Sequence, residues 1–362
     1  MKAQQLWVSA VLVSALCACI MDTSAEDKSM VPRTSIEAAR LPVEGQIPSL
    51  ARATAWLNSE PLRAQNLRGK VVLIDFWTYT CINWRRTLPY LRAWAQKYRD
   101  QGLVVIGVHT PELSFEKDID NVRRIAQEQR VDYPIAIDSD YAIWNAANNH
   151  YWPAAYLVDA QGRIRHHQFG EGDYEQFEVI IQQLLIEAGH SSFERQLVSV
   201  EGQGAEASAD WGNLRSPESY VGYARAENFA SPGGAARDRP GDYATPARLQ
   251  LNEWALAGNW TVRQEFAALN KANGTISYRF HARDLHLVMG PAARGAPIRF
   301  RVLIDGQPPG PAHGVDVDDE GHGRLDESRM YQLIRQPTAI TDRQFEIEFL
   351  DPGAEVFIFT FG

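Results

Sequence analysis

The sequence predicts two folded modules, an α/β module at residues 46–190 and an all-β sandwich at residues 217–362. Three observations lead to this division. An unbroken apolar run at residues 71–74 is typical of a strand that is buried on both faces. Strand-like and helix-like segments then alternate as far as residue 190. From residue 217 onward short alternating runs, separated by Gly, Pro and Asp, favour a sandwich or jelly roll.

Length and composition agree with two soluble modules. The chain has 362 residues, and a domain typically has roughly 150. Hydrophobic residues make up 45% and charged residues 22%, which is ordinary for a globular protein. The net charge of −9, with no basic stripe, argues against a nucleic-acid partner. We expect no cofactor.

The first 45 residues indicate export. Residues 1–19 have the pattern of a signal peptide, because the apolar stretch at residues 6–16 is too short to span a bilayer. The sequence Leu16-Cys17-Ala18-Cys19 resembles a bacterial lipobox, in which Cys19 is lipidated and anchors the protein on the periplasmic side of the envelope. Residues 20–45 would form a tether. The alternative is ordinary signal cleavage after Ala25.

The elements of the first module follow in order. We expect a small hairpin around residues 55–62, the buried strand from residue 71, a helix from 82 to about 99 and a strand at 103–108. Next come a surface helix at 115–130, a strand at 133–137, a short helix at 141–147, a strand ending at 159, a strand at 164–169 and a closing helix at 174–188. Residues 191–216 are rich in Gly, Ala, Ser and acidic residues, so we interpret them as a linker.

The second module carries five clear strand patterns. They lie at residues 275–281, 285–289, 298–304, 345–350 and 356–361.

The chemistry centres on residues 71–89, VVLIDFWTYTCINWRRTLP. Thr80 is a suitable cap for a helix that begins near Cys81. The amide groups and dipole at a helix N-terminus favour a thiolate, and Arg85 and Arg86 add positive charge. This arrangement predicts a reactive sulfur.

These residues resemble the thioredoxin signature, with Asp75 as its buried carboxylate and Pro89 as its helix proline. The longer text, WTYTCIN followed by RTLPYLRAW, is similar to the periplasmic TlpA-type and DipZ-type proteins. The resemblance implies a thioredoxin fold for residues 46–190. One residue departs from it, because Trp84 stands where the family has its second cysteine.

The family pattern implies further site residues. A cis-proline that faces the active cysteine falls on Pro153, and Trp152 with Pro153 would form the wall along which an extended substrate pairs. Tyr79, Asn83 and Trp84 would line the same groove.

The number of cysteines limits the mechanism that the sequence allows. Without Cys17 and a lipidated Cys19, Cys81 is the remaining thiol and has no internal disulfide partner. It can attack a disulfide and hold a mixed disulfide, but an outside thiol must release the product. The alternative is a relic thiol beneath a tryptophan lid.

Two carboxylates are candidate proton-transfer groups. By resemblance, Asp75 is a buried acceptor with a raised pKa, although its usual client cysteine is missing. Glu112 corresponds to an acidic residue that TlpA-like proteins place beside the cysteine. The alternatives are a carboxylate retained from ancestry at position 75 and an ordinary surface residue at position 112.

The second module is similar to the domain that follows thioredoxin in DipZ-like proteins, which resembles a carbohydrate-binding module. Aromatic residues that suit a sugar ring, unless they form the core, are Trp211, Tyr220, Tyr223, Trp254 and Trp260.

Metal sites are not expected. Residues 316–327 match the spacing of a calcium loop, but Gly323 stands at its hydrophobic position, so a polar turn is the better interpretation. His166 and His167 have no second pair at metal-binding spacing.

The sequence therefore predicts an exported thiol–disulfide oxidoreductase with one cysteine. Its expected partners are thiols and disulfides of envelope proteins or an external reducing thiol, with a carbohydrate and the membrane as further contacts. A protein- or carbohydrate-binding module without turnover is the main alternative. Thr78-x-x-Cys81 also resembles the peroxiredoxin motif, which makes a one-cysteine peroxidase a third hypothesis, although Ile74 replaces the expected proline.

Overall fold

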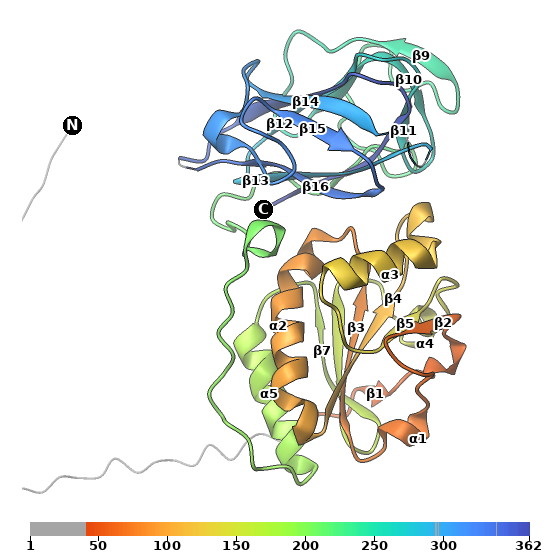
Figure 1. Ribbon diagram of the computed structural model, residues 1–362, viewed down its shortest axis with the longest axis vertical. Coiled ribbons are helices and arrows are strands. Elements are labelled where there is room, and N and C mark those ends of the chain that lie inside the picture. Colours follow the sequence, from red (N-terminus) through yellow and green to blue (C-terminus); the bar gives the residue numbers. More distant parts are fainter. Residues whose placement is uncertain (1–40, 294, 296, 338) are drawn as a thin grey trace, which may run out of the picture. The chain divides into compact units, whose positions relative to one another are not determined.

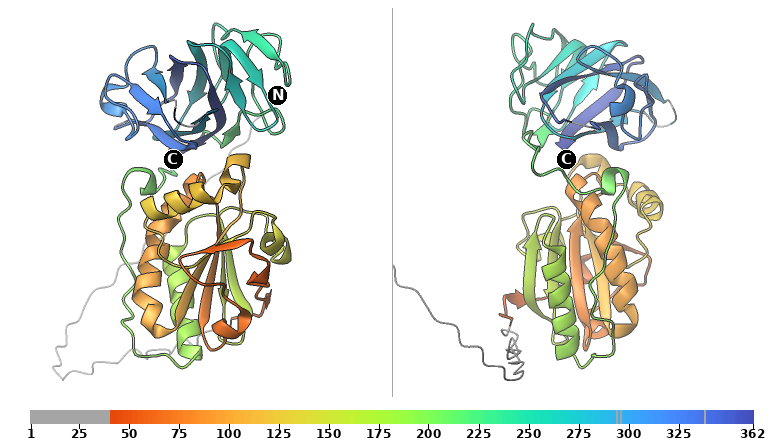
Figure 2. Two further views of the ribbon diagram at one scale, coloured as in Figure 1. Left: turned by 45° about the vertical axis from the view of Figure 1, so that its right-hand side comes forward. Right: turned by 90° about the vertical axis from the view of Figure 1, so that its left-hand side faces the viewer.

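Strand β3 (Val71–Trp77) lies in the middle of the first module and is buried along its whole length. The computed structural model describes residues 41–362 except 294, 296 and 338. The signal peptide, the lipidated Cys19 and most of the tether therefore lie outside the described residues. Both modules are drawn in Figures 1 and 2.

The first module contains a seven-stranded mixed sheet in the order β1-β7-β6-β3-β4-β5-β2. Strand β3 runs parallel to β4 and antiparallel to β6, and β4 runs parallel to β5. The remaining strands are β1 (Gly45–Gln46), β2 (Ala55–Leu57), β4 (Leu103–His109), β5 (Ile135–Ile137), β6 (Ala154–Val158) and β7 (Arg163–Phe169). This mixed sheet with helices on both faces is the thioredoxin fold that the sequence predicted.

Alternation along β3 divides the core between the two faces of the sheet. Val71, Leu73 and Trp77 pack against α2 (Ile82–Tyr98), α3 (Ile119–Glu128) and α5 (Tyr174–Glu187). Val72, Ile74 and Phe76 pack against α1 (Ala64–Leu67) and α4 (Ala142–Ala146). The apolar run is continuous because both faces of the strand are covered.

Gly107 on β4 leaves room for the aromatic side of this core. It pairs with Asp75 on β3, and a Cβ atom at this position would lie 2.7 Å from the indole nitrogen of Trp77. The strand therefore needs a glycine here.

Two predictions for the first module are wrong. Residues 55–62 do not form a hairpin, because β2 pairs antiparallel with β5, and the Asn58 side chain donates to the carbonyls of Val131 and Tyr133. The helix at 115–130 is divided into a 3₁₀ turn (Ser114–Lys117) and α3, because the Asp118 carboxylate caps α3.

The second module is a large curled antiparallel sheet. Its strands are β8 (Ser219–Tyr220), β9 (Pro240–Tyr243), β10 (Trp254–Val262), β11 (Ala267–Leu269), β12 (Gly274–Phe280), β13 (Asp284–Pro291), β14 (Ile298–Ile304), β15 (His322–Leu325), β16 (Arg329–Arg335), β17 (Arg343–Phe349) and β18 (Ala354–Phe361). The order is β15-β14-β17-β12-β10-β11-β18-β13-β16, with β8 beside β18 and β9 beside β10.

Strand β10 belongs to both halves of this sheet. Residues 254–257 pair with β12, whereas residues 258–262 pair with β9 and β11. Gly258, with φ of 94°, lies at the change of partner, where a side chain would be strained. The halves enclose one core that includes Trp254 and Trp260, so the core interpretation of these two residues is confirmed and they do not serve as sugar platforms.

The segment 191–216 packs against the first module. Its Glu206 pairs with Arg92 of α2, and the carbonyl of Gln196 accepts a hydrogen bond from Lys97. None of the helices that the structure describes is both long and apolar enough to cross a bilayer.

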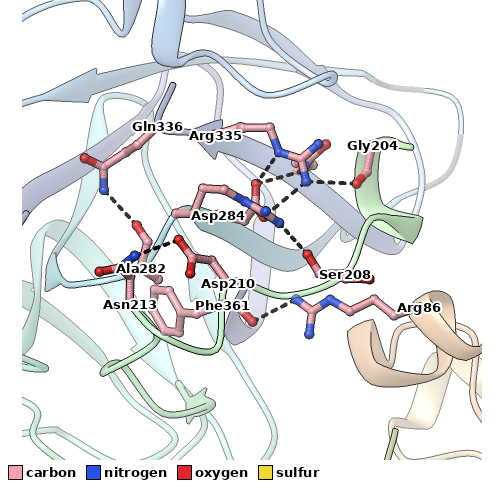
Figure 3. A network of polar contacts seen from close by, with 12 residues as sticks. Arg86, Gly204, Ser208, Asp210, Asn213, Ala282, Asp284, Arg335, Gln336 and Phe361 are labelled. Atoms are coloured by element: carbon pink, nitrogen blue, oxygen red, sulfur yellow. Dashed lines mark hydrogen bonds and ion pairs between the residues drawn. The ribbon is translucent and has the colours of Figure 1, made fainter. Parts of the chain in front are cut away.

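Arg86 of α2 contacts the last strand of the second module. One guanidinium nitrogen lies 2.9 Å from Glu171. Another donates to the carbonyl of Phe361 at 3.0 Å (Figure 3). Nearby, Arg335 binds both Asp284 and the carbonyl of Gly204. Because Arg86 and Glu171 are almost fully buried, loss of one partner would leave an uncompensated charge.

Candidate functional site

Cys81 is the N-cap residue of α2 and is half-buried. Its sulfur lies 3.8 Å from the carbonyl oxygen of Trp152. The peptide bond between Trp152 and Pro153 is cis. The expectation that a cis-proline loop faces the cysteine is therefore confirmed.

The sulfur lines a cavity of about 580 Å³. The first module contributes Cys81, Ile82, Asn83, Glu112 and Trp152. The rest of the chain contributes Trp211, Arg215, Glu218, Tyr220 and Arg225. Of the predicted site residues, Cys81, Asn83, Glu112 and Trp152 are thus brought together around one space.

A buried carboxylate, Glu116, holds the cysteine loop in place. It accepts hydrogen bonds from the hydroxyl of Thr80 at 2.7 Å and from the backbone N–H groups of Glu112 and Leu113 at 2.7 and 2.8 Å. The sequence predicted that Thr80 caps α2. This prediction is wrong, because the Thr80 hydroxyl is bound to Glu116 and Cys81 is the N-cap residue. Sequence reasoning missed Glu116, although an acidic residue close behind Glu112 was the available signal.

Glu112 is bound from the second module. Its Oε1 accepts from the hydroxyl of Tyr220 and from Arg225, both at 2.6 Å. The same hydroxyl lies 2.8 Å from Glu218 Oε2. The phenol hydroxyl of Tyr220 has one proton, so it can donate to only one of the two carboxylates. In the other contact the carboxyl group must itself be protonated and donate to the hydroxyl oxygen. The surface alternative for Glu112 is excluded, since its side chain is 9% exposed.

Glu218 is the better candidate for the protonated partner. Burial of its carboxyl group, and then the charge of Glu112, raise the pKa of Glu218 to about 7. The rest of the Glu218 residue is exposed to solvent, which weakens both the effect of burial and the effect of the Glu112 charge on this pKa.

Several groups act on the ionisation of the Cys81 thiol at the helix N-terminus. Burial raises the pKa of the Cys81 thiol, and the charges of Glu218 and Glu112 raise it further, whereas the amides of Trp84 and Asn83 lower it. Arg86 does not help, because its charge is paired with Glu171. Burial and the two carboxylates thus oppose the effect of the helix end, and the activated sulfur stays a prediction.

Trp84 lies beneath the site and does not line the groove. Its indole is fully buried, stacks on Trp77 with 4.2 Å between ring centroids, and donates from Nε1 to Asp75 Oδ2 at 2.9 Å. The groove-wall interpretation is wrong, and so is the tryptophan lid, because the indole packs into the core while Cys81 stays on the cavity wall.

Asp75 is directed toward Trp84. It is fully buried, which raises its pKa to about 7, while the hydrogen bond from Trp84 opposes the rise. Asp75 lines a separate narrow space with Pro153 and Phe177. The structure thus brings neither Asp75 nor the Pro153 ring to the wall of the Cys81 cavity.

Tyr79 is also a core residue. It is 2% exposed and stacks on His109 at 5.8 Å, so its expected place in the groove is wrong. The aromatic residues of the cysteine loop fill the space below the helix start, and the substrate side is left to Trp152 and to the second module.

The calcium-loop hypothesis is also wrong. The Asp316 carboxylate is occupied by Arg329 and by the backbone N–H of Gln332, and strand β15 crosses the stretch 316–327. Within the described residues, no group of three or more His, Cys, Asp or Glu side chains is arranged to hold a metal ion.

Comparison with known proteins agrees with this architecture. Residues 44–167 match the AhpC/TSA family, and residues 216–362 match the family described as "Thioredoxin like C-terminal domain". Thiol-disulfide oxidoreductase YkuV of Bacillus subtilis is 35% identical over 141 residues, which are 39% of this chain and 95% of that protein. The chain is a thioredoxin-like protein of the TlpA/DipZ type.

Similarity to Protein DipZ extends into the second module. The DipZ protein of Mycobacterium bovis is 39% identical over 274 residues, or 75% of this chain. The chain covers 38% of the length of that relative. A solved thioredoxin-like protein in the oxidised form is 34% identical and matches 40% of this chain and 96% of its own, with a TM-score of 0.37. The similarity to YkuV and DipZ supports a thioredoxin-like redox function.

Proposed function

We propose that this thioredoxin-like protein catalyses thiol–disulfide exchange through a single cysteine, Cys81. One observation carries the proposal: the Cys81 sulfur lines a cavity opposite the carbonyl of Trp152, while the place of a second cysteine is filled by Trp84. The similarity to thiol-disulfide oxidoreductase YkuV supports the reaction class.

The cycle needs two outside sulfur compounds. The Cys81 thiolate attacks a disulfide R–S–S–R′, which forms Cys81–S–S–R and releases R′–S⁻. An outside thiol then attacks the mixed disulfide, which restores Cys81 and releases R in a new disulfide. No electrons are gained or lost in total.

The thiol must lose its proton before attack. Because burial and acidic neighbours raise the pKa of Cys81, the proton needs an acceptor inside the cavity. Glu112, joined to Glu218 through the hydroxyl of Tyr220, is the group that we propose for this role.

Location and further contacts are part of the proposal. Lipidation at Cys19 would hold the protein at the periplasmic side of the envelope, as the sequence suggests. A carbohydrate would have Trp211, which is 61% exposed, as its available platform, since Trp254 and Trp260 belong to the core.

The main alternative is a binding module without turnover, and the raised pKa of the Cys81 thiol favours it. A one-cysteine peroxidase is less well supported. Thr78 is fully buried and stands outside the set of residues that line the cavity, so its hydroxyl is poorly placed to orient a peroxide beside the sulfur.

The test uses the mature chain and an activated aromatic disulfide, dithiobis(nitrobenzoate). We expect one adduct per chain by intact mass spectrometry, absent in Cys81→Ser and reversed by added thiol. If the native chain forms no adduct up to pH 9 while the unfolded chain does, the exchange function is wrong and the binding module remains. Peroxide consumption with a thiol donor would instead favour the peroxidase.

A further inference from the structure

We propose that the sulfur partner of Cys81 is a small zwitterionic disulfide or thiol of the amino-acid type, bound inside the cavity, and not a disulfide of a folded protein. This inference rests on the proposed exchange function and names its substrate class. It follows from the size of the cavity, from the chain segment that forms its far wall, and from the charges around it.

The size fits a small molecule. Sites for small ligands usually measure about 300–1,000 Å³, and the Cys81 cavity measures about 580 Å³. The sulfur is half-buried on its wall, so a disulfide must enter the cavity to meet it. A disulfide on the surface of a folded protein brings bulky backbone on both sides of the sulfur atoms.

The far wall belongs to the chain itself. Residues 214–218, with Tyr220, line the cavity together with Cys81 and Trp152. An extended protein substrate that paired beside Trp152 would have to share this space with the segment 214–218. A compact disulfide does not meet this restriction.

This wall is fixed by polar and apolar contacts. Arg225 lies 2.6 Å from Glu112, and its guanidinium group lies 3.4 Å from the centroid of the Tyr220 ring. Beside these contacts, Ile82 and Leu113 of the first module form one buried cluster with residues of the second module, Val288, Met330, Phe357 and Ile358. Opening the wall would expose this apolar surface to water.

The charges suit a zwitterion. Glu218 offers a carboxylate to an ammonium group, and the exposed Arg215 offers a guanidinium group to a carboxylate, whereas Glu112 and Arg225 are paired with each other. Trp152 and Trp211 add flat apolar faces along the same cavity. Amino-acid-type disulfides carry both charges within a few bonds of the sulfur.

The experiment compares three disulfides on the native chain. Cystine is zwitterionic, bis(2-hydroxyethyl) disulfide is small and neutral, and insulin is a protein disulfide. The rate of adduct formation at Cys81 is followed by intact mass at pH 8. We expect cystine to react several-fold faster than the neutral disulfide and at least tenfold faster than insulin.

Variants separate charge recognition from access. Arg215→Ala, at an exposed position, should slow cystine several-fold and leave the neutral disulfide unchanged. Arg225→Ala should weaken the wall and reduce the preference for cystine over insulin. Arg299→Ala, which removes an exposed arginine paired with Asp351, is the matched control and should change neither ratio.

The outcomes are distinguishable. If insulin reacts with the native chain as fast as cystine, the inference is overturned and the exchange function stands. If the neutral disulfide equals cystine and Arg215→Ala has no effect, the zwitterionic class is overturned. If no disulfide reacts, the exchange function fails, and this inference fails with it.

Discussion

The indole nitrogen of Trp84 donates a hydrogen bond of 2.9 Å to Asp75 Oδ2 in the core of the first module. By resemblance, a thioredoxin has its second sulfur at this helix position, and the buried carboxylate serves that sulfur. Here the carboxylate keeps a polar partner but has no thiol to deprotonate. The contact therefore connects Asp75 to stability more directly than to catalysis.

The first prediction concerns Asp75 and pH. Burial raises the pKa of this carboxyl from 3.8, its ordinary value in water, to about 7 in the folded chain, so the folded state binds the proton more tightly than the unfolded state. The free energy of unfolding should thus fall as pH rises from 5 to 8, by about 3 kcal/mol for this group. Asp75→Asn should remove that loss, as measured by denaturant unfolding at both pH values.

Asp100→Asn is the control for this experiment, because Asp100 is exposed. It should leave the pH dependence unchanged. Equal slopes for the Asp75→Asn variant and the parent chain would show that Asp75 titrates normally in the folded protein.

The second prediction concerns the thiol. Because burial, Glu218 and Glu112 raise the pKa of Cys81, iodoacetamide should modify the native chain more slowly than free cysteine at pH 8. At pH 8, above its pKa of about 7, the Glu218 carboxyl is ionised, so Glu218→Gln removes one of these charges. The alkylation rate at fixed pH should then increase, about tenfold for each unit by which the pKa of Cys81 falls.

A matched control is Glu227→Gln, at an exposed position of the same module. Its alkylation rate should equal that of the parent chain. A native chain that reacts faster than free cysteine would instead indicate that the helix end dominates.

The third prediction concerns Trp84→Cys. The substitution restores a second thiol but removes a fully buried indole that stacks on Trp77, so it should cost about 3–5 kcal/mol of folding stability. We expect little reduction of insulin disulfides by this variant, because position 84 is fully buried and does not line the cavity that contains the Cys81 sulfur.

Trp84→Phe provides the comparison. It keeps an aromatic ring but loses the hydrogen bond that lowers the pKa of Asp75, so this pKa should rise further. A two-cysteine variant with full stability and rapid insulin reduction would contradict the packing argument.

The fourth prediction concerns Glu116. Its carboxylate accepts hydrogen bonds from the Thr80 hydroxyl and from the backbone N–H groups of Glu112 and Leu113. Glu116→Gln replaces one carboxylate oxygen by an NH₂ group, which cannot accept a hydrogen bond from these donors. We expect a loss of about 1–3 kcal/mol in unfolding free energy. Glu128→Gln, at an exposed position of α3, is the control. Unchanged stability would mean that the cysteine loop is held by other contacts.

Local patterns predicted most of the first module. The apolar run of β3 and the apolar spacing of the helices were sufficient, because each element has its own period. The hairpin prediction failed because the partner of β2 is β5, far away in the sequence. Nothing within residues 55–62 distinguishes a hairpin partner from a distant edge strand.

The site was predicted in part for the same reason. Cys81, Trp152 and the cis-proline followed from the family resemblance, which connects two short motifs 71 residues apart. The wall formed by Tyr220 and Arg225 depends on contacts with Glu112 across more than a hundred residues. The pKa of the Cys81 thiol is raised first by burial and then by the carboxylates of Glu218 and Glu112, and neither effect can be read from the helix start alone.

Trp84 could have been placed better from the sequence. Asp75 and Trp77 alternate onto the same face of β3 as α2, so an aromatic residue in the first turn of that helix meets them directly. An indole at this point is a core residue with a hydrogen bond to a buried acid.

Gly107, Trp77 and Trp84 also bear on how such a chain can evolve. The glycine makes space for one indole, and that indole supports the other. A single codon change at position 84 would bring back a sulfur atom but leave an unfilled volume beneath it. A second thiol at position 84 would thus require compensating replacements around Trp77 to restore the packing of the interior.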